Sequence, residues 1–143
     1  MKPEPVHLRG VTDAIELARR VLRTRVGEVR RLAGGLQQRD QQGLHNFRIA
    51  CKRLRYALER FADIEPSLET VAKPLALLQD ALGEAHDRDV LLSVLPAAMA
   101  GTEHRLTGER EAWVDRAVAL WTQGQKLLLD CPLTAFEAAS NHS

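Results

Sequence analysis

Residues 45–56 of the chain read HNFRIACKRLRY, and this stretch decides which fold and which function the sequence predicts. In a helix with about 100° of rotation per residue, one face carries cations and an imidazole within an arc of roughly 80°. The members of this face are His45, Arg48, Lys52 and Arg55. An apolar face lies beside it on the same helix and is suited to burial. Like charges one turn apart repel each other, so a helix that keeps such a row is predicted to use it on an anion.

The composition predicts one helical domain with a nearly neutral surface. The chain has 143 residues, of which 45% are hydrophobic and 4% aromatic, and 20 basic residues face 19 acidic ones, for a net charge of +1. This length suits one core and is short for two domains. Few aromatic residues among abundant Leu, Ala, Arg and Glu favour helix over sheet. Anion binding must then come from where the cations lie, because the total charge is small.

Apolar residues at helical spacing predict four amphipathic helices. Thr12 is the expected N-cap of the first helix, which runs to about Ala33 and is stopped by Gly34 and Gly35. The second helix covers Leu44 to Ala62. A third begins near Ser67, or kinks at Pro74, and residues 83–89 read as a bend before a short helix that ends near Pro96. The last helix spans Glu109 to Asp130 and turns Trp113 and Trp121 toward the core.

Short links between these helices predict an all-α, antiparallel helical bundle of about four long helices. We expect a single domain over residues 1–143, with an ordered core at about 11–130. No run of about 18 apolar residues occurs, so no membrane span is expected. No signal peptide is expected either. Two distant cysteines, Cys51 and Cys131, indicate reduced thiols and a cytoplasmic location.

Two blocks of the sequence resemble the CHAD domain, the conserved-histidine α-helical domain. The first is His45-x-x-Arg48 followed by KRLRYALE at residues 52–59, and the second is LQDALG at residues 78–83 followed by Asp87, Asp89, Val90 and Leu91. The blocks cover about a third of the chain, in the order found in the family. The resemblance implies a helical domain that binds inorganic polyphosphate through basic residues on its helices, and that is not chiefly a catalyst.

Polyphosphate suits the cationic face because a linear polyanion without base edges needs only cations along its backbone. The planar fork of an arginine also donates two hydrogen bonds to one phosphate group. We therefore expect Arg48, Lys52 and Arg55 to bind polyphosphate, with Arg53, which lies off the main face, as a further contributor. His45, at the start of its helix, either contacts phosphate directly or bonds to a neighbouring helix. The alternative for the whole face is a solvated surface whose long side chains cover the core.

The first helix offers a second row of cations. Arg19, Arg23 and Arg30 lie within roughly 40° of one another on it. If the first two helices pack antiparallel, both rows line one groove, and polyphosphate contacts all of these residues. The alternative is an ordinary exposed helix face.

Metal binding and catalysis find little support in the sequence. His86, Asp87 and Asp89 are candidate ligands, but their spacing defines no ligand geometry, and an N-cap after the bend accounts for a carboxylate. No Gly-rich phosphate loop, H-E-x-x-H or G-x-S-x-G occurs. We expect no catalytic residue, no metal and no cofactor. The alternatives are a metal-dependent phosphohydrolase and a helical module for nucleic acid or protein; nucleic acid is the weaker expectation as a ligand.

The resemblance also suggests an assembly. Family members usually join two similar helical halves, whereas this sequence shows one His-x-x-Arg helix. We therefore expect a homodimer in which a second copy, related by a two-fold axis, supplies the other half. Binding of polyphosphate would further place the protein on polyphosphate granules.

Overall fold

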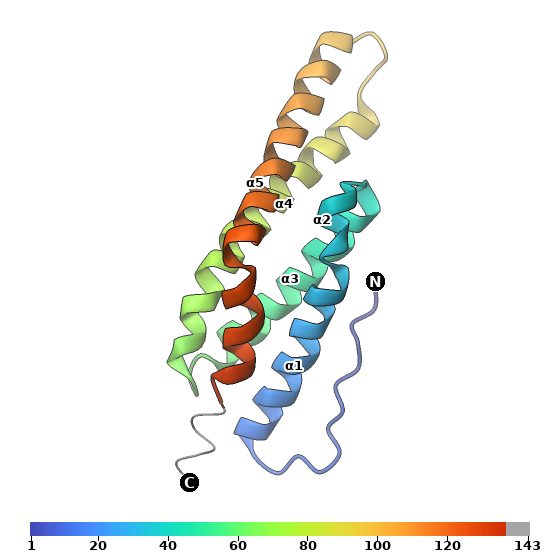
Figure 1. Ribbon diagram of the computed structural model, residues 1–143. Coiled ribbons are helices and arrows are strands. Elements are labelled where there is room, and N and C mark those ends of the chain that lie inside the picture. Colours follow the sequence, from blue (N-terminus) through green and yellow to red (C-terminus); the bar gives the residue numbers. More distant parts are fainter. Residues whose placement is uncertain (137–143) are drawn as a thin grey trace.

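The computed structural model describes residues 1–136, and within this range the chain forms helices and no strand. The predicted all-α bundle of four long helices is confirmed (Figure 1). The elements are α1 (Ala14–Leu32), the short α2 (Gly34–Gln38), α3 (Gln41–Phe61), the 3₁₀ turn η1 (Pro66–Leu68), α4 (Glu69–Val94) and α5 (Ala100–Thr134). The long helices run alternately up and down, and α3 packs against both α1 and α4, while α4 packs along α5. Residues 137–143, the end of the domain predicted from the sequence, lie outside the described residues.

The start of α1 and the turn after it differ from the prediction. Asp13, not Thr12, is the N-cap, and its carboxylate accepts a hydrogen bond from the Glu16 N–H at 2.8 Å. α1 ends at Leu32 with Ala33 as its C-cap, as predicted, but a second short helix, α2, begins directly at Gly34. Gly35 is needed there for a different reason: a Cβ on it would lie 3.1 Å from the Gly43 Cα and closer still to the Gly43 carbonyl. Gly35 and Gly43, neither of which has a side chain, therefore let α2 and α3 approach closely.

The predicted bend at residues 83–89 is wrong. α4 is continuous from Glu69 to Val94, with Pro74 inside its first turns. Asp89 is therefore not an N-cap; it accepts a hydrogen bond from Arg110 of α5 at 3.1 Å, and Arg88 donates to Glu109 at 3.3 Å. α5 likewise begins nine residues before the predicted Glu109, at Ala100. Long-range packing and these ion pairs outweigh the cost of a helical glycine, which is about 1 kcal/mol.

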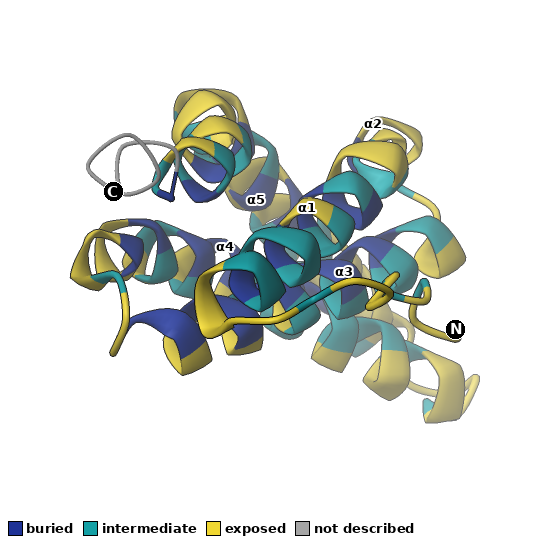
Figure 2. Cartoon of the chain, turned by 90° about the horizontal axis from the view of Figure 1, so that it is seen from below, coloured by how far each residue is buried: buried dark blue, intermediate teal, exposed yellow. Residues whose placement is uncertain are grey.

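The core lies where the four long helices meet. In Figure 2, which views the chain from below, the buried residues lie on the sides of the helices that face one another. Phe47 of α3 is fully buried and meets Trp121 of α5 edge to face, with ring centroids 5.3 Å apart. Trp121 thus lies in the core as predicted, and Trp113 is half-buried and packs against the same core. Cys51 is buried in this core, which raises the pKa of its thiol, and both cysteines are free.

An extended segment precedes α1 and returns along it (Figure 1). We call residues 1–13 the N-terminal strap. It crosses the outer side of α1 and reaches the arginines that project there. Among the described residues, no helix has the length and apolar character needed to cross a membrane.

Candidate anion-binding site

The seam between α3 and α4 collects the histidine and two of the cations predicted from the sequence. Three residues of α3 meet three of α4 in succession along it. The pairs are His45 with His86, Arg48 with Gly83, and Arg55 with Gln79. This α3–α4 seam follows from the antiparallel course of the two helices, because residue numbers rise along α3 as they fall along α4.

His45 stacks on His86 across the seam. Their ring centroids are 5.7 Å apart and the ring planes are inclined by 30°. Burial, together with the positive fields of His86 and Arg48, lowers the pKa of His45. Gln41 and Gln42 complete a surface hollow beside the two rings. Both roles expected for His45 therefore have a basis: it contacts the neighbouring helix, and it borders an open hollow.

Arg48 has an unusual environment in the middle of the seam. Its Nε is buried and, among the described residues, has no hydrogen-bond partner. Gly83 of α4 faces it closely, since a Cβ built at that position would lie in van der Waals contact with the Nε, at 3.9 Å. Arg48 borders a surface hollow of its own, which Asp80 and Asp87 of α4 and Trp113 of α5 also line. A buried guanidinium nitrogen without an acceptor costs about 1–3 kcal/mol, so an incoming anion would be favoured.

The remaining two cations of the predicted face have contrasting surroundings. Lys52 is exposed, and its ammonium lies 5.7 Å from the centre of the Tyr56 ring. Arg55 donates from Nε to Glu59 at 2.9 Å and from a terminal nitrogen to Gln79 at 3.3 Å. The hydrogen bond to Glu59 raises the pKa of Arg55. A ligand would therefore meet Lys52 freely but would have to share Arg55 with Glu59.

Arg53 points away from the seam toward α1. It contacts the carboxylate of Glu28 at 3.3 Å and also donates to the Met1 carbonyl. Glu28 is fully buried; besides Arg53 it pairs with Arg25 and accepts from the Glu4 N–H at 3.2 Å. Sequence reasoning missed Glu28. The only available signal was an acidic residue close to the apolar face of the first helix.

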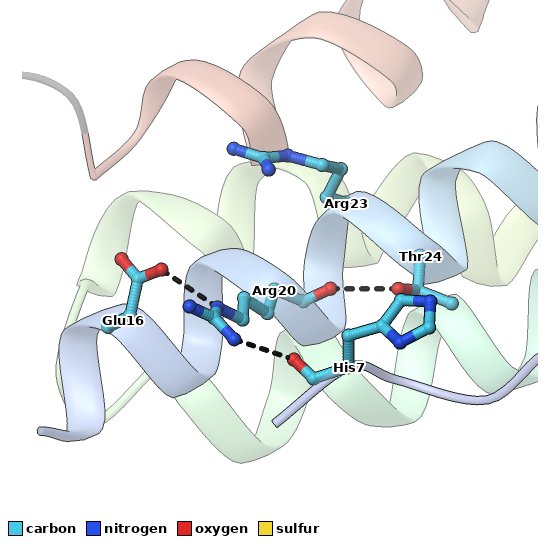
Figure 3. A pocket seen from close by; sticks show the side chains of 5 residues that line it. All are labelled: His7, Glu16, Arg20, Arg23 and Thr24. Atoms are coloured by element: carbon cyan, nitrogen blue, oxygen red, sulfur yellow. Dashed lines mark hydrogen bonds and ion pairs between the residues drawn. The ribbon is translucent and has the colours of Figure 1, made fainter. Parts of the chain in front are cut away.

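The cations of α1 lie apart from the seam. Arg19 pairs with Glu16 at 3.7 Å, while Arg23 and Arg30 are exposed. Arg23 borders a hollow of about 280 Å³ between α1 and the strap, together with His7 and Arg20 (Figure 3). The hollow around Arg48 is formed instead by α3, α4 and α5. Arg23 and Arg48, one from each row of cations, therefore border different hollows, and not the one groove that antiparallel packing was expected to give.

The described residues contain no cluster of three or more His, Cys, Asp or Glu side chains arranged to hold a metal ion. The candidate trio from the sequence is divided among different contacts. His86 stacks on His45, Asp87 borders the Arg48 hollow, and Asp89 pairs with Arg110.

The chain was compared with family models, curated proteins and solved structures, and only the family models give a match. A family model described as "CHAD domain" matches residues 3–96, which is 94 of the 143 residues and includes both sides of the α3–α4 seam. The matched region stops before α5, which nevertheless supplies Trp121 to the core. The chain belongs to the CHAD domain family.

Proposed function

We propose that the protein binds inorganic polyphosphate along the α3–α4 seam, without catalysing its turnover. The observation that carries the proposal is the buried Nε of Arg48, which lacks an acceptor among the described residues. A phosphate oxygen would supply that acceptor through a charge-assisted hydrogen bond, the stronger kind. Membership of the CHAD family supports a phosphate polymer as the ligand.

The seam also has a shape that suits a linear ligand. His45 and Arg55 are ten residues apart in α3, a distance of roughly 15 Å along the helix axis. Arg48 and Lys52 lie between them, so the cations follow one another in a row. Each added phosphate group can meet the next cation, and the affinity should grow with chain length until the row is filled.

Residues outside the seam have secondary roles in this proposal. Arg23 and Arg30 are exposed on α1 and would contact only longer chains, together with Arg19. Arg53 is engaged with Glu28 and lies outside the seam, so it would not contact a ligand bound in the seam. Binding of this kind would let the protein associate with polyphosphate granules in the cytoplasm.

A titration of the full chain tests the proposal. Polyphosphate, RNA and pyrophosphate are compared at equal phosphate concentration in chloride buffer. Replacing Arg48→Glu and Arg55→Glu should weaken polyphosphate binding by at least about tenfold each, because each loses a charge-assisted contact. Arg60→Glu is the matched control, since Arg60 is an exposed cation of the same helix that lies outside the seam.

The salt dependence adds a second measurement. The logarithm of the affinity should fall linearly with the logarithm of the salt concentration, with a slope of roughly −0.7 per phosphate contact. Equal losses in Arg60→Glu and Arg48→Glu would contradict a binding site in the seam. RNA binding equal to that of polyphosphate would favour a general nucleic-acid module instead.

A phosphohydrolase is the second candidate, and one observation favours it: Asp80 and Asp87 share the hollow with Arg48. Carboxylates beside an arginine are the elements that metal-assisted phosphate hydrolysis needs. We propose that these two carboxylates instead confine the anion to the Lys52 side of the seam. Phosphate release from polyphosphate with Mg²⁺ or Mn²⁺ decides between the two candidates; release that Asp87→Asn abolishes would establish the hydrolase.

A further inference from the structure

The N-terminal strap is bound by arginines through its oxygen atoms. Arg20 of α1 donates to the carbonyl oxygens of His7 and Arg9 at 2.9 and 2.6 Å (Figure 3 shows the first of these). Arg25 donates to the Glu4 carbonyl at 3.2 Å, and Arg53 of α3 donates to the Met1 carbonyl. Four carbonyl oxygens along an extended segment are thus held by three guanidinium groups.

A carboxylate of the strap completes this arrangement. Glu4 pairs with Arg31 of α1 at 2.6 Å. We call Arg20, Arg25, Arg31 and Arg53 the strap arginines. They donate to a row of oxygen acceptors that follow one another along an extended chain, and a linear phosphate polymer presents its oxygens in the same way.

The strap itself is packed loosely. Most of its side chains are exposed, Leu8 by 54%, and only a few, such as Val6 and Val11, are half-buried. Few buried apolar contacts and solvent-exposed hydrogen bonds are the marks of a segment with low local stability. The contacts that hold it are therefore chiefly those of the strap arginines, and a competitor for these donors would release it.

The surface beneath the strap has the charge that such a competitor needs. α1 contains six arginines and only two glutamates. Of these glutamates, Glu28 is buried under Arg25 and Arg53, and Glu16 pairs with Arg19 and Arg20. Release of the strap would break the ion pair between Glu4 and Arg31. This side of α1, which also carries the exposed Arg23, would then be strongly positive.

We propose that the strap arginines form a second polyphosphate-binding track, which the chain's own N-terminal strap covers until the polymer displaces it. This inference rests on the proposed function, because it assumes the same ligand. The α3–α4 seam is open and binds first. The covered track binds second, and its apparent affinity is reduced by the fraction of molecules in which the strap is closed.

Nuclear magnetic resonance of the full 16.0 kDa chain tests this order directly. During a titration with polyphosphate, the Gly83 amide reports on the seam and the Val6 and Leu8 amides report on the strap. We expect the Gly83 amide resonance to shift first. At higher polyphosphate concentrations, the strap amide resonances should move to random-coil positions and become narrower. Strap amides that stay unchanged at saturation, while Gly83 shifts, would overturn the covered track and leave the proposed function intact. If neither region shifts, the proposed function itself fails.

A pair of single-charge variants gives an independent readout. Glu4→Gln removes the ion pair with Arg31, so it should loosen the strap and tighten polyphosphate binding by up to about fivefold. Glu103→Gln is the matched control, because Glu103 is an exposed carboxylate in the first turn of α5, far from the strap in the chain. It loses the same charge without touching the strap. An equal increase in polyphosphate affinity in the two variants would show a general charge effect and would contradict the proposal.

Discussion

His45 of α3 and His86 of α4 stack across the seam with their ring centroids 5.7 Å apart, and in the described part of the chain the surroundings of His45 disfavour its protonation. Burial disfavours the imidazolium, and the fields of His86, Arg48 and the chain's amino terminus do so as well. The pKa of His45 is therefore lowered below its usual value near 6.5.

This lowered pKa predicts a loss of stability in weak acid. The unfolded chain takes up the proton more readily than the folded one, so the free energy of unfolding is highest above the unfolded pKa. It falls as the pH drops below about 6.5 toward the lowered folded pKa. Urea midpoints measured at about pH 7.5 and about pH 5.5 should differ more for the natural chain than for His45→Gln. The control is His104→Gln, because His104 is an exposed histidine. An equal change of the urea midpoint between the two pH values in all three proteins would contradict the prediction.

Two glycines should respond in opposite ways to alanine. Gly35→Ala places a Cβ against the Gly43 backbone, so it should lower the free energy of unfolding by about 1–3 kcal/mol. Gly27→Ala in α1 meets no atom within 4 Å and should raise it by about 0.5–1 kcal/mol through better helix propensity. Thermal or denaturant unfolding of both variants measures this contrast. Stabilisation by both would show that α2 and α3 can separate without cost.

Glu28 should be far more sensitive to substitution than an exposed carboxylate. Glu28→Gln removes the negative charge that Arg25 and Arg53 share in a buried position, and we expect it to cost about 3 kcal/mol. Glu59→Gln removes the exposed ion pair with Arg55 and should change stability by less than about 1 kcal/mol. Denaturant midpoints compare the two variants, and similar costs would show that the Glu28 cluster contributes no more than a surface pair.

The expected homodimer is tested by light scattering. A mass of twice 16.0 kDa is expected at tens of micromolar, because a second copy would supply the second helical half that family members usually carry. The side of α5 that bears Trp121 is used in the chain's own core, so an interface on this helix would use its exposed side, near Leu127. A mass near 16.0 kDa, with and without polyphosphate, would show that the chain remains a monomer.

The sequence predicted best what depends on local periodicity. The second helix was expected at Leu44 to Ala62 and is found at Gln41–Phe61, and its apolar face, which includes Phe47 and Leu54, is buried as expected. Local rules failed at the glycines. Gly83 was read as a bend, but it lies inside α4, where α5 packs along the helix and Arg110 holds Asp89. A glycine permits a break in a helix, and tertiary contacts decide whether the break occurs.

Prediction of the candidate site was limited by the same dependence on tertiary contacts. The spacing of Arg48, Lys52 and Arg55 placed them on one helix face without showing what each would meet. The Nε of Arg48 lacks an acceptor among residues 1–136, while Arg55 is shared with Glu59, and both facts depend on how α4 approaches α3 and on side-chain rotamers. The role of Arg53 depends on Glu28, a residue 25 positions earlier, and no local pattern connects the two.

The buried Nε of Arg48 would also attract buffer anions, so the choice of buffer should affect measurements on this protein. A solute that binds only the folded chain raises its melting temperature according to its concentration relative to its dissociation constant. Orthophosphate and sulfate carry the same oxygen acceptors as the polymer, so they would stabilise the chain and lower its apparent affinity for longer ligands. Under the proposed binding, samples purified in phosphate and in chloride would differ in ligand occupancy, so dialysis into chloride should come before any comparison of variants.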